Sequence, residues 1–397
     1  MKEPKIRFKE FEGEWEDHTL GDFGHISMCK RIFKNQTSPD GDIPFFKIGT
    51  FGYTPDAYIS RKLYEEYRQL YPFPHKGDIL ISAAGTIGRT VEYMGEDAYY
   101  QDSNIVWLNH SNDIDNKFLK YLYSHTNWNN LEGATIKRLY NSILLSTKSN
   151  CPSLAEQQKI ASFFTTIDAQ ISASTSRLAS LKQIKAASLQ AMFPQEGETV
   201  PKLRFKGFEG EWEKVKLGEI GSWSKGRLLS KSDLEKDGKY RCIHYGELFV
   251  FYGEVINNVI SKTNINNGCF SQFGDILFPD SDVTPNGLAR CSSLMIDNVV
   301  LGGGIIIFRL FGHNNSSFIS YAINVEKKQI INSVTGTTVR HINSSALSKI
   351  NIRIPEEAEQ RAIASYFTNL DRQITLQARR LEKLKQIKAA CLDKMFV

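Results

Sequence analysis

The sequence predicts an α+β protein with two mostly β units, each followed by a long α-helix, and with the two helices pairing as an antiparallel coiled coil with pseudo-twofold symmetry. Three observations predict this fold. The chain contains an internal duplication, each copy alternates short β-rich stretches with turn residues, and each copy ends in an apolar stripe of helical spacing. The length of 397 residues is enough for two globular units of about 150 residues each and for the helices.

The duplication is clearest at the two ends of each copy. Residues 4–21 and 201–218 are identical at 13 of 18 positions without a gap, and residues 133–193 align with residues 336–396. The inserts between these ends share almost no sequence. A repeat without functional meaning is the alternative, but a copied frame with different inserts is typical of a chain that recognises two unlike targets with one geometry.

Each unit is predicted to be mostly β with a few short helices. β-rich stretches at residues 43–48, 77–82, 105–108 and 299–308 alternate with clusters of Gly, Asn, Asp and Pro. A proline ends each unit, and a long helical pattern follows it. We therefore divide the chain into a first unit (residues 1–152), a first long helix (153–193), a second unit (194–354) and a second long helix (355–397).

Apolar residues recur at steps of three and four in both long helices and form one seam on each. A helix of 40 residues is about 60 Å long, and such a seam requires a partner helix. Two seam positions are polar in both copies: Ser174 and Lys185 correspond to Gln377 and Lys388. The seam is expected at Ile160, Phe164, Ile167, Ile171, Leu178 and Leu181, and at Ile363, Phe367, Leu370, Ile374, Leu381 and Leu384.

The copied segment at residues 4–21 also predicts how the chain closes. Its twin, residues 201–218, directly follows the first long helix, so pseudo-twofold symmetry places residues 4–21 beside the end of the second helix, near Met395. The FEGEWE sequence inside each copy is apolar and acidic, which is unsuited to DNA. We expect it to pack against a helix end or a partner subunit.

Composition excludes several classes of protein. The net charge of +5 allows a polyanionic partner without indicating one, and the six cysteines show neither a disulfide pattern nor metal-ligand spacing. No apolar run is long enough for a membrane span, and the first residues are charged throughout. We expect a cytoplasmic protein with no metal site and no membrane partner.

The copied motifs resemble the conserved regions of the specificity subunits of type I restriction-modification systems, the HsdS family. They are PKLRFKGFEGEWEKVKLGEI, KGDILISAAGTIGR and the P-x-L-A-E-Q-Q-K-I sequence before the long helix. The second copy departs from the pattern, because GDILFPDSDVTPNGLAR lacks the compact GxxGR of the first. The resemblance covers essentially the whole chain.

The resemblance implies a non-catalytic DNA-recognition subunit. Residues 24–150 and 221–353 would be two target-recognition domains, each recognising one half of a split, asymmetric site in duplex DNA. The helices would be a spacer that docks two methyltransferase subunits, through which restriction/translocase subunits join. S-adenosylmethionine, ATP and Mg would be bound by those partner subunits, and this chain would bind no cofactor.

The inserts carry cations for phosphates and polar or aromatic groups for base edges. Residues 82–89 form a small-residue loop whose backbone N–H groups would approach a phosphate, although a plain β-turn explains it equally well. Residues 135–140 pair in our alignment with residues 337–342, and a solvated basic face is the alternative for every cation. The candidates are Lys30, Arg31, Lys34, Arg61, Lys62, Arg68, Arg89, Thr135, Lys137 and Arg138 in the first unit, and Lys225, Arg227, Lys231, Arg241, His244, Tyr245, Arg290, Thr337, Thr338, Arg340 and His341 in the second.

Enzymatic motifs are missing from the sequence. It has no glycine-rich methionine-cofactor loop with an NPPY-type tetrapeptide and no phosphate-binding loop. The nearest imitation of a metal-dependent nuclease is Pro279-Asp280 with Glu326, Lys327 and Lys328 far downstream, and its first half is absent from the other repeat. We therefore predict no catalytic site. A two-domain scaffold that binds proteins without DNA specificity is the alternative function.

Overall fold

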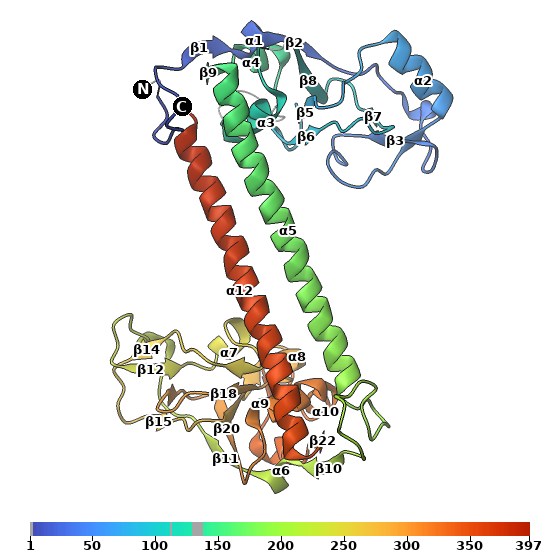
Figure 1. Cartoon of the computed structure of the whole chain (residues 1–397). Coiled ribbons are helices and arrows are strands. Elements are labelled where there is room, and N and C mark those ends of the chain that lie inside the picture. The colour runs from blue at the N-terminus through green and yellow to red at the C-terminus, as the bar shows by residue number, and fades with distance from the viewer. Residues whose placement is uncertain (1–2, 112, 129–137) are drawn as a thin grey trace. The chain divides into compact units, whose positions relative to one another are not determined.

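The structure is a computed structural model that describes residues 3–111, 113–128 and 138–397 (Figure 1). The chain divides into two compact units. The first unit contains Met1–Thr175 and Arg379–Val397, and the second contains Ser176–Ala378. The long helices α5 (Leu154–Met192) and α12 (Glu357–Met395) each contribute one part to either unit. Each unit is therefore assembled from two separate stretches of helix and one β-rich domain.

The first unit contains two small sheets and a two-stranded ladder. The four-stranded sheet has the order β2-β8-β5-β6, the three-stranded sheet has the order β4-β3-β7, and β1 pairs with β9. The strands are β1 (Glu16–Thr19), β2 (Gly24–Ser27), β3 (Ile43–Phe46), β4 (Tyr58–Ile59), β5 (Ile79–Ser82), β6 (Thr90–Glu92), β7 (Tyr99–Tyr100), β8 (Ile105–His110) and β9 (Lys148–Cys151). The short helices are α1 (Leu20–Phe23), η1 (Lys34–Gln36), α2 (Arg61–Leu70), α3 (Asn116–His125) and α4 (Asn141–Ser146).

The second unit repeats this arrangement and extends it. Its sheets have the orders β11-β20-β16-β18-β13 and β14-β12-β19-β15, with the ladders β10-β22 and β17-β21. The strands are β10 (Glu213–Lys216), β11 (Gly221–Lys225), β12 (Tyr240–Ile243), β13 (Val255–Ile256), β14 (Lys262–Thr263), β15 (Cys269–Phe270), β16 (Asp275–Pro279), β17 (Ser281–Asp282), β18 (Ser292–Leu294), β19 (Val300–Leu301), β20 (Ile305–Leu310), β21 (Arg340–His341) and β22 (Asn351–Ile354). The helices are α6 (Leu217–Ile220), η2 (Lys231–Asp233), α7 (Glu247–Val250), α8 (Pro285–Leu288), α9 (Ser316–Val325), α10 (Lys327–Asn332) and α11 (Ser344–Leu347).

The four stretches predicted to be strands are confirmed as β3, β5, β8 and the pair β19 and β20. The copied Gly-Asp-Ile-Leu sequence shows why the frame repeats. Gly77 and Gly274 have φ values of +98° and +86°, which glycine adopts without the strain that other residues incur. The following aspartates each accept a hydrogen bond from the backbone three residues earlier: His75 N to Asp78 at 2.7 Å and Gln272 N to Asp275 at 2.8 Å. The same turn therefore starts the central strand of both units.

The predicted closure of the chain is confirmed inside the first unit. The backbone N–H of Ile6 donates to the carbonyl of Lys394 at 3.0 Å, and the Trp15 ring meets the edge of Phe396. The second unit has the same contacts, from Leu203 to Ala191 at 2.8 Å and from Trp212 to Phe193. The FEGEWE segments thus pack against helix ends, as predicted.

Salt bridges hold both copied segments to the starts of the long helices. Arg7 pairs with Glu156, and Arg204 pairs with Glu359, each with a guanidinium N to carboxylate O distance of 2.7 Å. Both glutamates are buried, and both arginines also donate to backbone carbonyls of the FEGEWE loop. Burial of each carboxylate is compensated because its charge is paired and hydrogen-bonded.

Within each unit, the parts of α5 and α12 run antiparallel. In the first unit Phe164 contacts Phe396 and Asp168 pairs with Lys388 at 2.6 Å; in the second unit Lys185 pairs with Asp371 at 2.6 Å. The lysines at the polar seam positions therefore form ion pairs with the opposite helix. Buried seam residues are Ile160, Phe164, Ile167, Leu181, Ile363, Phe367, Leu370 and Leu381, and half-buried ones are Ile171, Leu178, Ile374 and Leu384.

Two further findings concern the chain as a whole. Cys29, Cys151, Cys242 and Cys291 are buried, and all six cysteines are free thiols, as the scattered positions predicted. A search of the described residues finds no helix whose length and apolar character would suit a membrane span.

Candidate nucleic-acid interface

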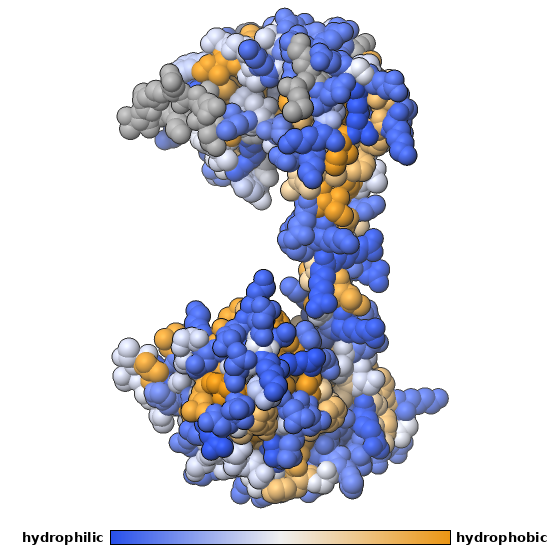
Figure 2. Space-filling model, turned by 90° about the vertical axis from the view of Figure 1, so that its left-hand side faces the viewer, coloured by the Kyte–Doolittle hydropathy of each residue, from blue (hydrophilic) through white to orange (hydrophobic). Residues whose placement is uncertain are grey.

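The candidate residues lie in loops, in the short helices η1, α2 and η2, and on the strands β11, β12 and β21. The face of the molecule in Figure 2 is mainly hydrophilic. In the first unit, residues 30–36 connect β2 to the second sheet. Lys30 lies over the ring of Tyr71 at 4.7 Å, and its carbonyl accepts a hydrogen bond from Tyr99. Arg31 pairs with Asp102 at 2.8 Å but remains 60% exposed, and Lys34 is exposed at the start of η1. This segment therefore presents three adjacent cations from an anchored backbone.

Three candidate cations lie on α2, whose N-cap is Ser60. Two of its three candidate cations are used inside the unit. Arg61 pairs with Asp97 at 3.0 Å, and this hydrogen bond raises the pKa of Arg61. Arg68 lies over the Phe73 ring and donates to the Tyr64 hydroxyl at 3.2 Å. Lys62 is exposed, and it is the α2 cation best placed to meet a phosphate.

The loop after β5 shows the plain turn that was the alternative to a phosphate cradle. Its backbone N–H groups donate inward, from Gly88 to the carbonyl of Ser82 at 3.0 Å and from Arg89 to the Ser82 hydroxyl at 3.0 Å. The Arg89 guanidinium donates to the carbonyl of Phe51 at 3.0 Å and stacks on the exposed ring of Tyr53. The loop is therefore closed by its own hydrogen bonds and offers Arg89 and Tyr53 at its edge.

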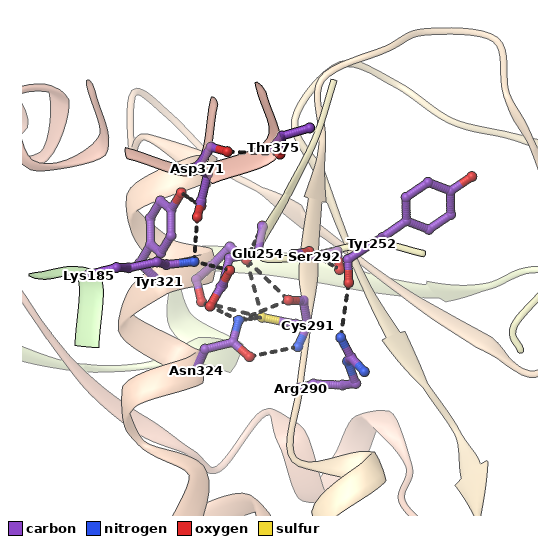
Figure 3. A network of polar contacts seen from close by, with 12 residues as sticks. Lys185, Tyr252, Glu254, Arg290, Cys291, Ser292, Tyr321, Asn324, Asp371 and Thr375 are labelled. Atoms are coloured by element: carbon purple, nitrogen blue, oxygen red, sulfur yellow. Dashed lines mark hydrogen bonds and ion pairs between the residues drawn. The ribbon is translucent and has the colours of Figure 1, made fainter. Parts of the chain in front are cut away.

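Arg290 in the second unit bonds to backbone carbonyls as Arg89 does. It donates to the carbonyl of Phe249 and to that of Tyr252, both at 3.0 Å, and the bond to Tyr252 is seen in Figure 3. Burial lowers the pKa of Arg290 from its ordinary value. The second unit thus has a half-buried arginine bonded to backbone carbonyls although it lacks the compact GxxGR sequence, and its contact with DNA stays a prediction.

The pairing of residues 135–140 with residues 337–342 was wrong by one position. Leu139 N donates to the carbonyl of Ala83 at 2.8 Å, and Ile342 N donates to the carbonyl of Asp280 at 3.0 Å. These bonds make Leu139 equivalent to Ile342, and hence Arg138 equivalent to His341. Aligning the GAT sequence of the first copy with the GTT sequence of the second gives the same correspondence. Thr135 and Lys137 lie outside the described residues.

Arg138 and Arg340 differ in their surroundings. Arg138 donates to the carbonyl of Ser103 at 2.9 Å and lies near the Tyr140 ring. Arg340 forms part of β21, opposite Asp282 of β17, and is half-buried. Its neighbours His341, Thr337 and Thr338 are exposed. The hydroxyl and imidazole groups of this segment are therefore exposed, while the guanidinium of Arg340 is partly buried beside them.

The remaining candidates of the second unit lie on two sides of β12. Lys225 ends β11, with its Nζ 3.6 Å from the Asp280 carboxylate, and Arg227 is exposed in the following turn. An open hollow places Lys231, His244 and Tyr245 together. Arg241 is exposed on β12 itself. The second unit therefore brings Lys231, His244 and Tyr245 into one concave surface and leaves Arg241 on a strand.

The nuclease-like residues have structural roles. The carboxylate of Asp280 accepts a hydrogen bond from the Ser281 hydroxyl and pairs with Lys225, and Glu326 bonds Gln329 at the start of α10. Over the described ranges, no group of three or more His, Cys, Asp or Glu side chains is arranged to hold a metal ion. Asp280 directly precedes β17 and has a structural role there. The alignment of the two copies places Asp280 at the position of Ala83, which could have indicated this role.

The two units share one frame and the two long helices, and they differ in their surface loops. The chain belongs to the type I restriction modification DNA specificity domain family, whose model matches residues 12–183 and 209–386. It is therefore a specificity-subunit chain of a type I restriction-modification system, and the resemblance in the copied motifs is confirmed.

Relatives differ in how much of the chain they match. A putative type I restriction enzyme specificity subunit from Haemophilus influenzae is 57% identical over 144 residues, which is 36% of this chain and 37% of that protein. The chain thus spans little more than a third of that relative. The type I restriction enzyme MjaVIII specificity subunit from Methanocaldococcus jannaschii is 20% identical over 426 residues, covering 97% of this chain and 94% of that one.

Solved structures show the same fold. The type I restriction-modification S subunit from M. genitalium has a TM-score of 0.68 at 16% identity and covers 100% of this chain and 99% of that chain. A chain from a structure of type I R-M complex assembly and conformational transition has a TM-score of 0.51 at 16% identity, covering 98% and 99%. The predicted α+β architecture is therefore confirmed.

Proposed function

We propose that this chain is the non-catalytic DNA-recognition subunit of a type I restriction-modification complex and that each unit recognises one half of a split, asymmetric duplex site. One observation carries this proposal: the two units share sheet order and helix contacts, while the loops at the ends of their sheets differ. Identical frames present different side chains only where the target differs. A single contiguous site would not require two such surfaces.

The chemistry of the loops favours DNA over the alternative of a protein-binding scaffold. Exposed cations occur at corresponding places in both units, on the segment after β2 (Lys30, Arg31, Lys34) and on the segment after β11 (Arg227, Lys231). Phosphate contacts position a protein on duplex DNA, and polar groups beside them recognise bases. The hollow with His244 and Tyr245 adds imidazole, phenol and ammonium groups in one place.

Docking of two methyltransferase subunits is supported by a surface whose residues are the same in both units. Each unit has a hollow at the start of its long helix, lined in the first unit by Glu14, Glu16, Pro152 and Gln157. The second unit has the equivalent residues Glu211, Glu213, Pro355 and Gln360. Two equal acidic hollows suit two copies of one partner that presents basic groups. Partner subunits would bind S-adenosylmethionine, ATP and Mg.

The test is an exchange of residues 24–130 for those of a relative, with the chain expressed beside its methyltransferase partner. Methylome mapping should show one changed half-site and one unchanged half-site. For a control, an exchange of residues 221–333 should change the other half-site only. Purified wild-type chain should be retained on duplex DNA, and four phosphate contacts would weaken binding at least about 100-fold between roughly 50 and 200 mM salt.

Other outcomes would count against the proposal. Two half-sites that change together after a single exchange would contradict recognition by separate units. Retention on DNA that does not depend on salt concentration, or no retention at all, would favour the protein-binding scaffold. Cleavage or methylation of DNA by the purified chain alone would contradict its non-catalytic role.

A further inference from the structure

The second unit contains a small two-stranded element that lies beside α8. We call it the β17–β21 tip and define it as residues 281–284 and 335–341. Ser281 pairs with His341 and Asp282 pairs with Arg340 in antiparallel register. On its other side, His341 exchanges two backbone hydrogen bonds with Thr335, at 3.0 and 2.8 Å. The tip is therefore held by two ladder pairs and one bridge, with residues 283–284 and 336–339 forming the turns beside them.

Local hydrogen bonds hold both turns of the tip. The Asp282 carboxylate accepts from the Thr284 hydroxyl at 2.8 Å, and that hydroxyl accepts from Gly287 N at 3.1 Å. On the other strand, Gly336 has a φ of +95°, and a Cβ there would collide with the carbonyl of Val339. Because the backbone is held before any ligand arrives, side chains at the turns lose little freedom on binding.

Two valines are exposed on these turns. Val283 is 71% exposed and Val339 is 48% exposed. Val283 directly follows Asp282 and Val339 directly precedes Arg340, the last pair of the ladder. The unit thus presents a pair of apolar side chains on a ribbon whose other exposed groups, Thr337, Thr338 and His341, are polar.

Cations lie near the valines, each with a carboxylate beside it, and Asp282 is opposite Arg340 in the ladder. Arg340 follows Val339 directly, and Lys225 lies beside Asp280 at the base of the ribbon. Duplex DNA has one apolar group among the base edges of the major groove, the 5-methyl group of thymine. The major groove also admits a two-stranded β-ribbon.

We propose that Val283 and Val339 are specificity-determining residues that contact thymine methyl groups in the major groove of the half-site recognised by the second unit. This inference rests on the proposed DNA-recognition function and names the part of the base edge that the tip detects. Arg340 and Lys225 then hold the neighbouring phosphates. The valines discriminate thymine from cytosine because only thymine has the methyl group at the position that they cover.

The experiment uses the full chain and the methylated motif mapped with its methyltransferase partner. Duplex probes carry deoxyuridine in place of each thymine of the second unit's half-site, one at a time, which removes only the methyl group. The wild-type chain should bind at least one uracil probe about fourfold more weakly, the factor that corresponds to roughly 0.8 kcal/mol for one buried methyl group. Val283→Ser or Val339→Ser should bind the thymine and uracil probes equally well.

Controls separate the tip from the rest of the chain. Val200→Ser removes an exposed valine outside the tip, in the segment after α5, and should keep the wild-type ratio of thymine to uracil binding. For probes with uracil in the first unit's half-site, the change in binding should be the same in the wild-type chain and in either tip variant. Because all three valines are exposed, each variant should unfold at the wild-type temperature.

The outcomes distinguish this inference from the proposed function. An unchanged ratio of thymine to uracil binding in the tip variants, with site-specific DNA binding intact, would overturn the methyl contact alone. A second half-site without thymine would overturn it as well. A chain that binds no duplex specifically would instead overturn the proposed function on which the inference rests.

Discussion

Lys185 occupies a seam position of α5 where the heptad pattern calls for an apolar residue. Its ammonium group lies between Glu254 at 2.7 Å and Asp371 at 2.6 Å, and Tyr321 donates a hydrogen bond to the same Asp371 (Figure 3). Glu254 belongs to the β domain and Asp371 to α12. One side chain of α5 therefore joins three parts of the second unit. The equivalent Lys388 of the first unit pairs with Asp168.

Lys185→Met should destabilise the second unit by about 1–3 kcal/mol, because two partly buried carboxylates would lose their cation. Lys388→Met should cost less, since Lys388 is 28% exposed against 16% for Lys185. The measurement is urea unfolding together with amide hydrogen exchange, which should accelerate in α9 and stay unchanged in α3 for Lys185→Met. Lys383→Met, an exposed position of α12, is the control and should stay within about 0.5 kcal/mol.

The pH dependence of this contribution has a definite sign. Burial opposes the charge on Lys185, but Glu254 and Asp371 outweigh it and raise its pKa above the ordinary 10.5. A raised pKa means that the stabilisation is complete below the ordinary value and is lost only as pH rises through the folded value. The effect of Lys185→Met should therefore be equal at pH 7 and pH 9. A decline between these values would contradict a charged Lys185.

At the scale of elements, the start of each long helix is built by the copied Ala-Glu-Gln sequence. Gln157 accepts from Asp115 N at 2.9 Å and donates to the carbonyl of Pro152 at 3.0 Å. In the second unit, Gln360 makes the same two bonds, to Asn315 N and to the Pro355 carbonyl. The helix start is thus tied to the β domain in front of it, which keeps the adjacent acidic hollow in one shape.

If the hollows dock methyltransferase subunits, reversal of one charge in each should remove one copy of the partner at a time. Glu14→Lys and Glu211→Lys should each give a complex with a single methyltransferase, and the double variant should give none. Both glutamates are exposed, so the chain itself should stay folded and bind DNA. Native mass spectrometry of the co-expressed complex measures the stoichiometry. Two bound copies in the double variant would show that the methyltransferase subunits do not dock at these hollows.

At the scale of the whole molecule, the copied segments close the chain on itself. Ile6 bonds Lys394 in the first unit just as Leu203 bonds Ala191 in the second. In the second unit, residues 194–200 connect the helix end to the copied segment covalently. The first unit has the same contacts without that connection, so its termini lie near each other (Figure 1).

A permuted chain that begins at Pro201 and ends at Val200, with Val397 joined to Met1, should therefore fold. A linker of three residues makes the new connection from Phe396 to Pro4 as long as residues 194–200. The expected result is a wild-type circular dichroism spectrum, a melting temperature within a few degrees and an unchanged methylated motif. A soluble permutant in which the first unit alone is unfolded would contradict this closure.

The sequence by itself determined the features that are periodic or copied. The duplication, the two long helices and their polar seam positions, the closure beside Met395 and the GDIL turns all follow from spacing between neighbours along the chain or from comparison of one copy with the other. These signals are local or repeated, so they can be recognised in the sequence without knowledge of tertiary contacts.

Only the tertiary structure decided which divergent residues meet. Residues 24–76 and 221–273 share almost no sequence, yet β3 pairs in parallel with β7 and β12 pairs in parallel with β19. The hydrogen bonds of the Arg290 guanidinium to two backbone carbonyls, and the exposure of the apolar residues Val283 and Val339, are visible only in the structure. The reason is that a side chain's direction depends on strand pairing across long stretches of chain, which no local pattern specifies.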